Sequence, residues 1–368
     1  MKRYLQQQIL TDLDEKMVFL AGPRQVGKTT LSKALVKSFD YLNWDIDEGR
    51  TRILKKEFEK SDLWIFDEVH KYKAWRSYLK GLFDHLGTSQ KILVTGSAKL
   101  NELRKGGDSL QGRYHFLRLM PLSVAELKMS SPSDIETLFR LGGFPEPFFR
   151  GSQASADRWT RGYQERIIRQ EISSLELFQE HARIEILVGR LPDVVGGLLS
   201  INSLSEDIQA DSKTVLKWIL SLERLYSLFR VGPFGSPKIK SLKKAQKLYF
   251  YDWNLIAEEG PRFENFMAVH LLKWIFYQQD TLGKNIELRY YRDKNDREVD
   301  FVIVEKNKPL YFIECKFSQS ESSRGIRYLK SIFPEARALQ VSLKTKKNFV
   351  DGYGVEHCSA LSFLRDLV

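Results

Sequence analysis

Met17-Val-Phe-Leu-Ala21, followed directly by Gly22-Pro-Arg-Gln-Val-Gly27-Lys28-Thr29, is the stretch that decides the fold of the first part of this chain. A short apolar run ends at a glycine-rich loop, and residues 30–39 have helical character. Strand, loop and helix in this order are the setting in which such a loop binds phosphate groups. The glycines let successive backbone N–H groups point at the phosphates, and the helix N-terminus adds positive potential. The stretch predicts an α/β domain with a nucleotide site.

Two side chains at the end of the loop have separate roles in this prediction. Lys28 reaches the terminal phosphates, and the hydroxyl of Thr29 ligates the Mg²⁺ ion that accompanies ATP. The other residues assigned to the nucleotide site here are Gly22, Arg24, Gly27 and Thr30. Arg24 is expected to contact either phosphate or nucleic acid. The predicted cofactors are therefore ATP and Mg²⁺.

An acid pair follows the next buried run. Leu63-Trp-Ile-Phe66 is apolar and ends in Asp67-Glu68. A buried strand can deliver these acids to its C-terminal end, where Asp67 joins the Mg²⁺ shell and Glu68 acts as general base on the attacking water. The alternative is an acidic strand end on a surface turn. The glycine loop favours the hydrolytic arrangement.

The middle of the chain has the pattern of a helix-turn-helix. A helix is predicted over 201–209, a break at Ala210-Asp-Ser212, and a longer helix from Lys213 to Leu225. The side chains expected on the solvent-exposed face of the second helix are Lys213, Lys217 and Arg224. The predicted inner face consists of Val215, Leu216, Ile219, Leu220 and Leu222.

Two predicted strands, 229–234 and 247–251, complete a winged helix around a lysine-rich connection. Lys243 and Lys244 lie in that connection, and a run of lysines is suited to the phosphates of DNA. The residues assigned to DNA binding are Lys213, Lys217, Lys243 and Lys244. The alternative is a packing module with solvated lysines.

The C-terminal part carries a carboxylate-lysine cluster. Strands are predicted over 287–292, 297–304 and 310–316. Side chains two residues apart in a strand share a face, so Glu314 and Lys316 project together, and Asp300 on the neighbouring strand can meet them. Glu264, in the first turn of an amphipathic helix, is the fourth member.

This geometry suits phosphodiester hydrolysis. Asp300, Glu314 and Glu264 would ligate Mg²⁺ with the backbone carbonyl of Cys315, while Lys316 positions or stabilises the nucleophile. Asp300, Glu314 and Lys316 are accordingly the predicted catalytic residues here. A surface ion pair between Glu314 and Lys316 is the alternative.

Two resemblances join these parts. The loop, the acid pair and the strand Lys91–Thr95 resemble P-loop ATPases of the AAA+ class, and the C-terminal cluster resembles the PD-(D/E)xK nuclease fold. With Met120-Pro-Leu-Ser-Val-Ala-Glu126-Leu and Leu141-Gly-Gly-Phe-Pro-Glu146-Pro, nearly the whole chain resembles a prokaryotic family of AAA-type ATPases with a C-terminal restriction-endonuclease-like domain. That family is related to the archaeal-type ATPases, and a helical lid is expected around residues 122–195.

The AAA+ resemblance assigns further residues. It implies that a polar residue after the third strand senses the γ-phosphate, a role that Ser97 or Thr95 fits. It also implies that Arg113 reaches across a subunit boundary to stabilise transferred charge, which requires a homo-oligomer such as a ring. A surface arginine in a glycine-rich loop is the alternative.

Composition fits this organisation. The 368 residues carry 58 lysines and arginines against 47 acids, a net charge of +11 that favours a polyanionic partner such as double-stranded or branched DNA. Two cysteines are too few for a disulfide framework, and no apolar run is long enough to span a membrane, so a cytoplasmic protein is expected.

The predicted fold class is α/β, with four parts. These are a P-loop AAA+ ATPase domain (1–128), a helical lid (129–195), a winged helix (196–250) and a mixed α/β restriction-endonuclease-like domain (251–368). The leading functional prediction is ATP hydrolysis coupled to DNA processing by the nuclease-like domain. The alternatives are a junction-binding or remodelling protein that does not cut, and a signalling or defence ATPase with a protein partner.

Overall fold

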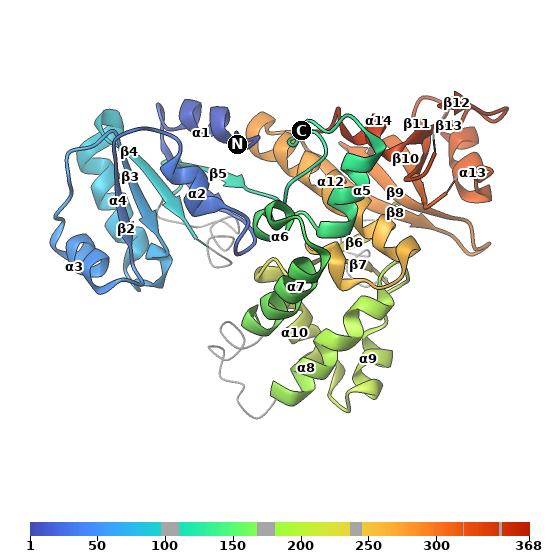
Figure 1. Ribbon diagram of the computed structural model, residues 1–368, viewed down its shortest axis with the longest axis horizontal. Helices are drawn as coiled ribbons and strands as arrows, with labels where there is room; N and C mark the ends of the chain where they lie inside the picture. The colour runs from blue at the N-terminus through green and yellow to red at the C-terminus, as the bar shows by residue number, and fades with distance from the viewer. Residues whose placement is uncertain (97–109, 168–180, 236–244, 319, 346–347) are drawn as a thin grey trace. The chain divides into compact units, whose positions relative to one another are not determined.

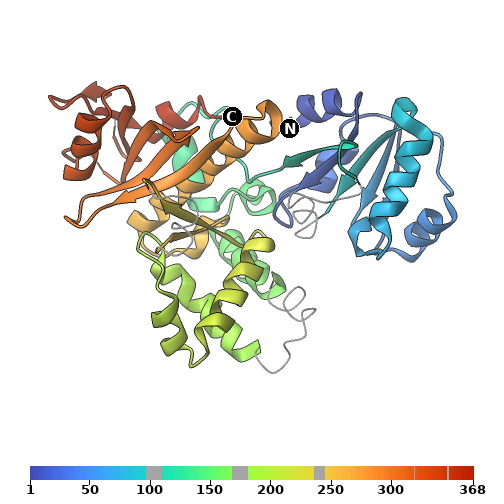
Figure 2. The same cartoon turned by 180° about the vertical axis from the view of Figure 1, so that it is seen from behind.

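The computed structural model describes residues 1–96, 110–167, 181–235, 245–318, 320–345 and 348–368 (Figures 1 and 2). The chain divides into two compact units. Unit 1 comprises Met1–Met120 and Asp280–Gly283, and unit 2 comprises Pro121–Gln279 and Lys284–Val368. None of the described helices is long and apolar enough to cross a bilayer.

Unit 1 is built on a parallel sheet with the strand order β2-β3-β4-β1-β5. Its strands are β1 (Met17–Ala21), β2 (Phe39–Asn43), β3 (Leu63–Asp67), β4 (Lys91–Thr95) and β5 (Tyr114–Arg118). Every residue of β1 and β3 is buried, as expected for strands covered on both faces. Since the strands are parallel, the loop after β1 and the acids at the end of β3 share one edge of the sheet. The predicted α/β fold of this part is confirmed.

One short helix precedes β1, and the others connect the strands of this sheet. They are α1 (Gln6–Asp12), α2 (Lys28–Lys33), α3 (Asp47–Lys55) and α4 (Trp75–Leu86), with 3₁₀ turns at Val69–Lys71 and Gly87–Ser89. The helix after the loop ends at Lys33, earlier than the predicted range of residues 30–39, and β2 begins at Phe39. Gly22 is required at the start of the loop: its φ is +144°, and a Cβ there would lie 2.2 Å from the carbonyl oxygen of Leu119.

The end of β5 carries a buried ion pair. The Arg118 guanidinium donates to both carboxylate oxygens of Asp280, at 2.8 and 2.6 Å, and both side chains are almost fully buried. Asp280 lies near the end of a long helix, α12 (Glu259–Leu282), whose last residues belong to unit 1. Buried charges of this kind are stable only when they are paired.

The helical part of unit 2 begins at a capping box. Ser131 accepts from the backbone N–H of Asp134, whose side chain accepts in return. The helices and 3₁₀ turns are α5 (Pro132–Leu141), α6 (Pro145–Arg150), α7 (Gln153–Ile167), α8 (His181–Arg190), Leu191–Val194, α9 (Ile201–Asp207), α10 (Ser212–Arg224) and Trp253–Leu255. In the Leu-Gly-Gly-Phe-Pro segment, a Cβ at Gly143 would lie 2.5 Å from the Trp253 ring, so close packing explains that glycine.

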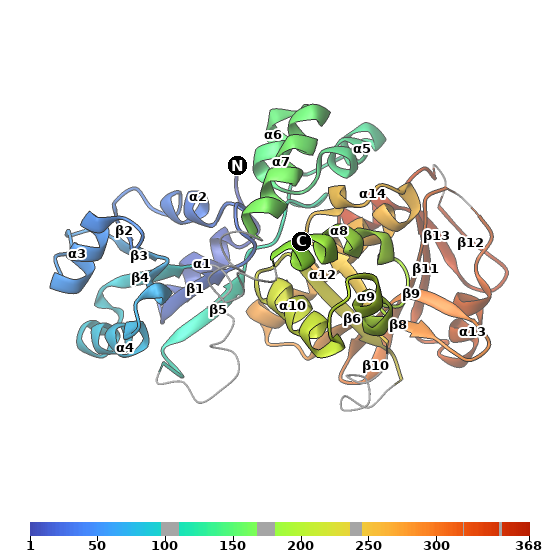
Figure 3. The same cartoon turned by 90° about the horizontal axis from the view of Figure 1, so that it is seen from below.

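Unit 2 also contains an eight-stranded sheet with the order β12-β13-β11-β10-β9-β8-β6-β7. Its strands are β6 (Leu228–Pro233), β7 (Lys247–Phe250), β8 (Ile286–Arg292), β9 (Glu298–Glu305), β10 (Lys308–Lys316), β11 (Arg337–Ser342), β12 (Phe349–Val350) and β13 (Glu356–Ser359). Two more helices, α13 (Arg324–Ile332) and α14 (Ala360–Leu364), flank the sheet (Figure 3).

The two strands predicted as a wing have a different setting. They form β6 and β7 and pair antiparallel, but β6 also pairs parallel with β8, so they extend the edge of the C-terminal sheet. The side-chain amide of Asn265 on α12 bonds the backbone N–H and C=O of Phe250, both at 2.7 Å. This pair of hydrogen bonds fixes α12 against β7 and brings Glu264 to the sheet.

Candidate functional site

Asp67, the last residue of β3, organises the predicted nucleotide site. Its Oδ2 accepts from the Thr29 hydroxyl at 3.0 Å and from the Tyr41 hydroxyl at 2.6 Å, and its Oδ1 accepts from the Thr95 hydroxyl at 2.7 Å. The loop threonine and the strand acid therefore meet, as the two Mg²⁺ ligands of an ATP site must. Thr95, one of the two γ-phosphate sensors considered, is committed to Asp67, whereas Ser97 lies outside the described residues.

Lys28 is buried within the loop. Its Nζ donates to the carbonyl oxygens of Gly22 and Pro23, at 3.0 and 2.8 Å. Burial lowers the pKa of Lys28 to about 8, opposed by the charges of Glu68 and Asp67. Around it, Arg24 is partly exposed and Thr30 is exposed in the first turn of α2. The loop thus holds the Lys28 ammonium in a position to bind an anion such as a phosphate group.

The pKa of Lys28 predicts how nucleotide affinity depends on pH. Phosphate beside the ammonium favours its charged form, so the pKa of Lys28 rises on binding. ATP affinity should be constant between pH 7 and about 8 and then weaken by up to about tenfold per pH unit as free Lys28 loses its proton. Calorimetry in two buffers of different ionisation enthalpy should detect proton uptake above about pH 8. A constant affinity up to about pH 9.5 would contradict this, and Lys28→Ala should remove the dependence.

Glu68 is held beside this site in an unusual backbone conformation. Its φ is +56°, and its N–H donates to the carbonyl oxygen of Thr95 at 3.0 Å. Its carboxylate lies 3.5 Å from Lys71 Nζ and 3.5 Å from His70 Nε2. Burial raises the pKa of Glu68, with Lys71 opposing the rise. A carboxylate with a raised pKa is a better proton acceptor, as a general base requires.

Arg113 does not reach the nucleotide site of its own chain. It precedes β5, whose Tyr114 pairs with Met17 and whose Arg118 pairs with Ala21. Arg113 therefore lies at the edge of the sheet opposite the glycine loop, about 20 Å away along the strand. Its guanidinium binds Asp84 of α4, at 2.6 and 3.2 Å. Any catalytic role for Arg113 requires a second copy of the chain and stays a prediction.

The second helix of the predicted helix-turn-helix presents a basic face. Asp211 caps α10 by accepting from the Lys213 N–H at 2.8 Å. Lys213, Lys217 and Arg224 are exposed, as expected. Leu220, predicted inside, is 38% exposed, and Trp218 is buried in its place because it lies on the opposite side of the helix. Lys243 and Lys244 lie outside the described residues.

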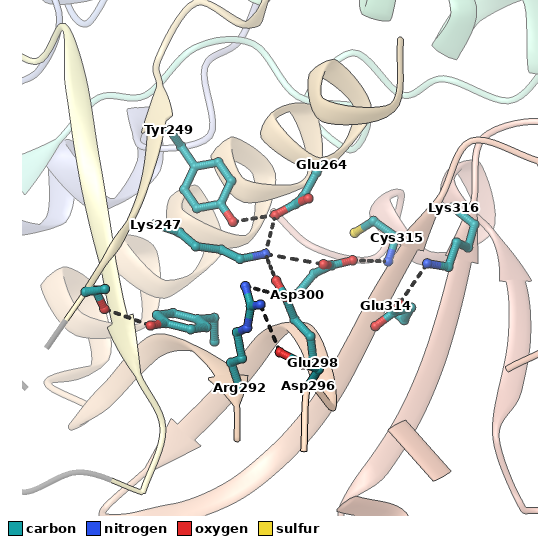
Figure 4. A network of polar contacts seen from close by, with 12 residues as sticks. Lys247, Tyr249, Glu264, Arg292, Asp296, Glu298, Asp300, Glu314, Cys315 and Lys316 are labelled. Atoms are coloured by element: carbon teal, nitrogen blue, oxygen red, sulfur yellow. Dashed lines mark hydrogen bonds and ion pairs between the residues drawn. The ribbon is translucent and has the colours of Figure 1, made fainter. Parts of the chain in front are cut away.

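The C-terminal cluster comes together on β9, β10 and α12 (Figure 4). Ile313 pairs with Phe301, and one further residue in this antiparallel register sets Glu314 opposite Asp300. Glu314 forms an ion pair with Lys316 at 2.8 Å. The Asp300 carboxylate accepts a hydrogen bond from the Cys315 N–H at 2.8 Å. The three predicted catalytic residues therefore do share one place.

A lysine outside the predicted site residues lies in the middle of the cluster. Lys247 Nζ is 3.0 Å from Glu264 Oε1, 2.6 Å from Glu298 Oε1 and 3.5 Å from Asp300 Oδ1 (Figure 4). Burial lowers the pKa of Lys247, but Glu264, Asp300 and Glu298 together raise it above its ordinary value. Burial and the nearby Asp300 raise the pKa of both Glu264 and Glu314.

The predicted Mg²⁺ ligands at this second site do not fit a bound ion. Across the parts of the chain that the structure describes, no three His, Cys, Asp or Glu side chains are arranged to hold a metal. The physical reason is Lys247, whose positive charge lies between Glu264 and Asp300. Glu314 Oε2 is buried without a hydrogen-bond partner among the described residues, but one oxygen does not make a divalent site.

Comparison with protein families divides the chain into three parts. Residues 14–128 match the family model of an AAA domain. Residues 132–258 match a domain of unknown function, DUF8612, and residues 259–359 match another, DUF4143. Together with the contact between Thr29 and Asp67, the first match identifies the N-terminal part as an AAA-type ATPase domain.

Relatives share much of the chain at low identity. An uncharacterized protein of Mycobacterium tuberculosis is 23% identical over 327 residues, which cover 84% of this chain and 73% of the relative. An uncharacterized protein of Methanocaldococcus jannaschii is 21% identical over 374 residues, which cover 90% of this chain and 82% of the relative.

Solved structures show weaker likeness. A point variant of Thermotoga maritima RuvB has a TM-score of 0.31 at 17% identity, covering 62% of this chain and 88% of its own. The Aeropyrum pernix ORC1 protein in complex with DNA has a TM-score of 0.34 at 11% identity, and the match covers 73% of this chain and 93% of the ORC1 chain. Scores this low do not bear on function.

Proposed function

We propose that this chain hydrolyses ATP with Mg²⁺ in unit 1 and binds DNA through unit 2, with a C-terminal domain that binds rather than cuts. The observation that carries the proposal is the contact between the Thr29 hydroxyl and the Asp67 carboxylate, with Glu68 next in sequence. A loop threonine and a strand acid brought together in this way are what an ATP·Mg²⁺ site requires.

The residues of unit 1 divide the chemistry among them. Lys28 and the N–H groups of the glycine loop hold the phosphates, and Thr29 and Asp67 hold Mg²⁺. ATP·Mg²⁺, when bound, supplies the phosphoryl group that is transferred to water. Glu68 orients that water and accepts its proton, and Lys71 keeps the Glu68 side chain in place. Tyr41 and Thr95 fix the Asp67 carboxylate from two sides.

The DNA-binding part of the proposal rests on charge. The chain carries a net charge of +11, and α10 exposes Lys213, Lys217 and Arg224 on one side at helical spacing. Lysines and arginines clustered along one helix face are the electrostatic footprint of a nucleic-acid-binding protein. A winged helix and a homo-oligomer, with Arg113 acting across subunits, remain further parts of the proposal.

Substitution of the α10 lysines should change how DNA binding depends on salt. Each lost phosphate contact lowers the slope of log affinity against log salt concentration by about 0.9. Lys213→Ala with Lys217→Ala should therefore reduce the slope by about two and weaken binding at least about tenfold at physiological salt. Fluorescence anisotropy with linear and four-way-junction DNA over a salt series measures both quantities.

The matched control removes two exposed lysines of unit 1, Lys55 and Lys60, which leaves net charge equal to that of the α10 variant. It should retain the wild-type slope. Equal slopes for wild type and the α10 variant would contradict DNA binding by this helix. If no DNA binds at physiological salt, the function shifts to a signalling or defence ATPase with a protein partner.

Mg²⁺-dependent DNA cleavage is the second candidate, because Asp300, Glu314 and Lys316 do come together on neighbouring strands. Incubation of wild type with Mg²⁺, ATP and linear, nicked or branched DNA tests it. Cleavage that Asp300→Ala and Lys316→Ala both abolish would establish the nuclease in place of the non-cutting domain.

A further inference from the structure

Lys247 begins β7 and is only 1% exposed. It pairs with Val231 on β6, so its backbone is held in the sheet. A fully buried lysine is costly unless its charge is compensated by acids nearby. Here three carboxylates from two other elements, α12 and β9, surround the ammonium (Figure 4).

The three oxygens around Lys247 form a closed cation site. Glu298 and Glu264 lie within hydrogen-bond distance, at 2.6 and 3.0 Å, and Asp300 is at 3.5 Å. An ammonium has three N–H donors and no acceptor, so it can donate one hydrogen bond to each of these three carboxylates. The Tyr290 ring, with its centroid 5.9 Å from Nζ, lies beside it.

Further contacts from within the chain engage these acids. Asp300 Oδ2 accepts from the Cys315 N–H, and Glu264 Oε1 also accepts from the Tyr249 hydroxyl at 2.6 Å. Glu298 has a second cation, Arg292, at 3.6 Å. Contacts from within the chain therefore engage both oxygens of Asp300 and of Glu298, and one oxygen of Glu264.

We propose that the Lys247 ammonium is the resident cation of this cluster and occupies the position that a divalent ion would take between Glu264 and Asp300. A second cation at that position would be repelled at short range and would compete for the same oxygens. The domain consequently needs no metal to fold and lacks the metal that would activate water for phosphodiester hydrolysis. This proposal concerns the C-terminal cluster alone and holds whether or not unit 1 hydrolyses ATP.

Manganese binding tests the proposal directly. Mn²⁺ is titrated without nucleotide and its free concentration is followed by electron paramagnetic resonance, with Asp67→Asn in every sample to remove the site in unit 1. The starting chain should show no Mn²⁺ binding that depends on Asp300. Lys247→Met keeps the length of the side chain without its charge and should gain one site, at least about tenfold tighter than any in the starting chain.

The matched control is Lys316→Met, which removes a lysine from the periphery of the same cluster. It should gain no site, and Asp300→Asn should remove the site gained by Lys247→Met. Mn²⁺ binding by the starting chain that Asp300→Asn abolishes would overturn the proposal. A folded Lys247→Met chain that binds no Mn²⁺ would overturn it too, since the carboxylates would then not define a cation site.

Removal of Lys247 leaves buried carboxylates without their partner and can prevent folding. A second measurement therefore keeps Lys247. Thermal unfolding of the Asp67→Asn chain should be the same with EDTA and with millimolar Mg²⁺. A rise in Tm with Mg²⁺ that disappears in Asp300→Asn would show that the metal displaces the lysine and would refute the proposal.

Discussion

Replacement of Lys28 by alanine is expected to reduce ATP turnover by about 10²- to 10³-fold, the usual cost of removing one donor aimed at developing charge. The ammonium is buried among loop carbonyls, 3.0 Å from Gly22 O and 2.8 Å from Pro23 O, so it is already positioned where phosphates enter. The loss should appear in phosphate release at saturating ATP. Nucleotide affinity, measured by calorimetry, should fall as well because Lys28 contacts the ground state.

The control for this variant is Lys37→Ala, which removes an exposed lysine shortly after α2. It should keep wild-type turnover. Circular dichroism checks that both variants are folded. Turnover within roughly twofold of wild type in Lys28→Ala would mean that the glycine loop is not the hydrolytic site.

The sequence predicts the strand, loop and helix around Lys28 because these parts are local. The loop lies between one strand and one helix, so its residues need no distant partner to be recognised. Asp67 is also predictable, since an apolar run that ends in two acids indicates the end of a buried strand. Tyr41 could not be found in this way, because its bond to Asp67 joins two neighbouring strands whose pairing the sequence does not display.

Lys247 shows a different limit. In the sequence it closes a lysine-rich stretch and resembles part of a basic DNA-binding track. The sequence does show that side chains alternate between the two faces of this strand, so Lys247 and Tyr249 in the run Lys-Leu-Tyr-Phe from 247 to 250 share a face. In the structure both of them contact Glu264. Only the pairing of β7 at the edge of the C-terminal sheet turns that face toward the carboxylates.

The two predicted catalytic centres differ in what the sequence can predict of them. Asp300, Glu314 and Lys316 were placed together correctly, because strand periodicity and a short hairpin determine their spacing. Whether such a cluster binds metal depends on the charges that other elements bring to it. Lys247 and Glu298 supply those charges here, and neither belongs to the motif. A motif therefore predicts where side chains meet better than it predicts which ion they bind.

Replacement of Glu68 by glutamine should separate ATP binding from hydrolysis. Glutamine has nearly the same shape and its backbone N–H can still donate to Thr95 O, but its amide cannot accept a proton from water. Turnover should fall by about 10²- to 10⁴-fold, the range for loss of a general base, while ATP affinity changes little.

Single-turnover phosphate release and calorimetry, compared with Glu48→Gln at an exposed position of α3, measure the two effects of Glu68→Gln. Glu48→Gln should behave as wild type in both. Normal turnover in Glu68→Gln would mean that another residue is the general base for ATP hydrolysis. Loss of ATP affinity together with turnover would instead show that the Glu68 carboxylate, 3.5 Å from Lys71, holds the site together without activating water. Burial raises the pKa of Glu68, which makes its carboxylate a better proton acceptor, as the role of general base requires.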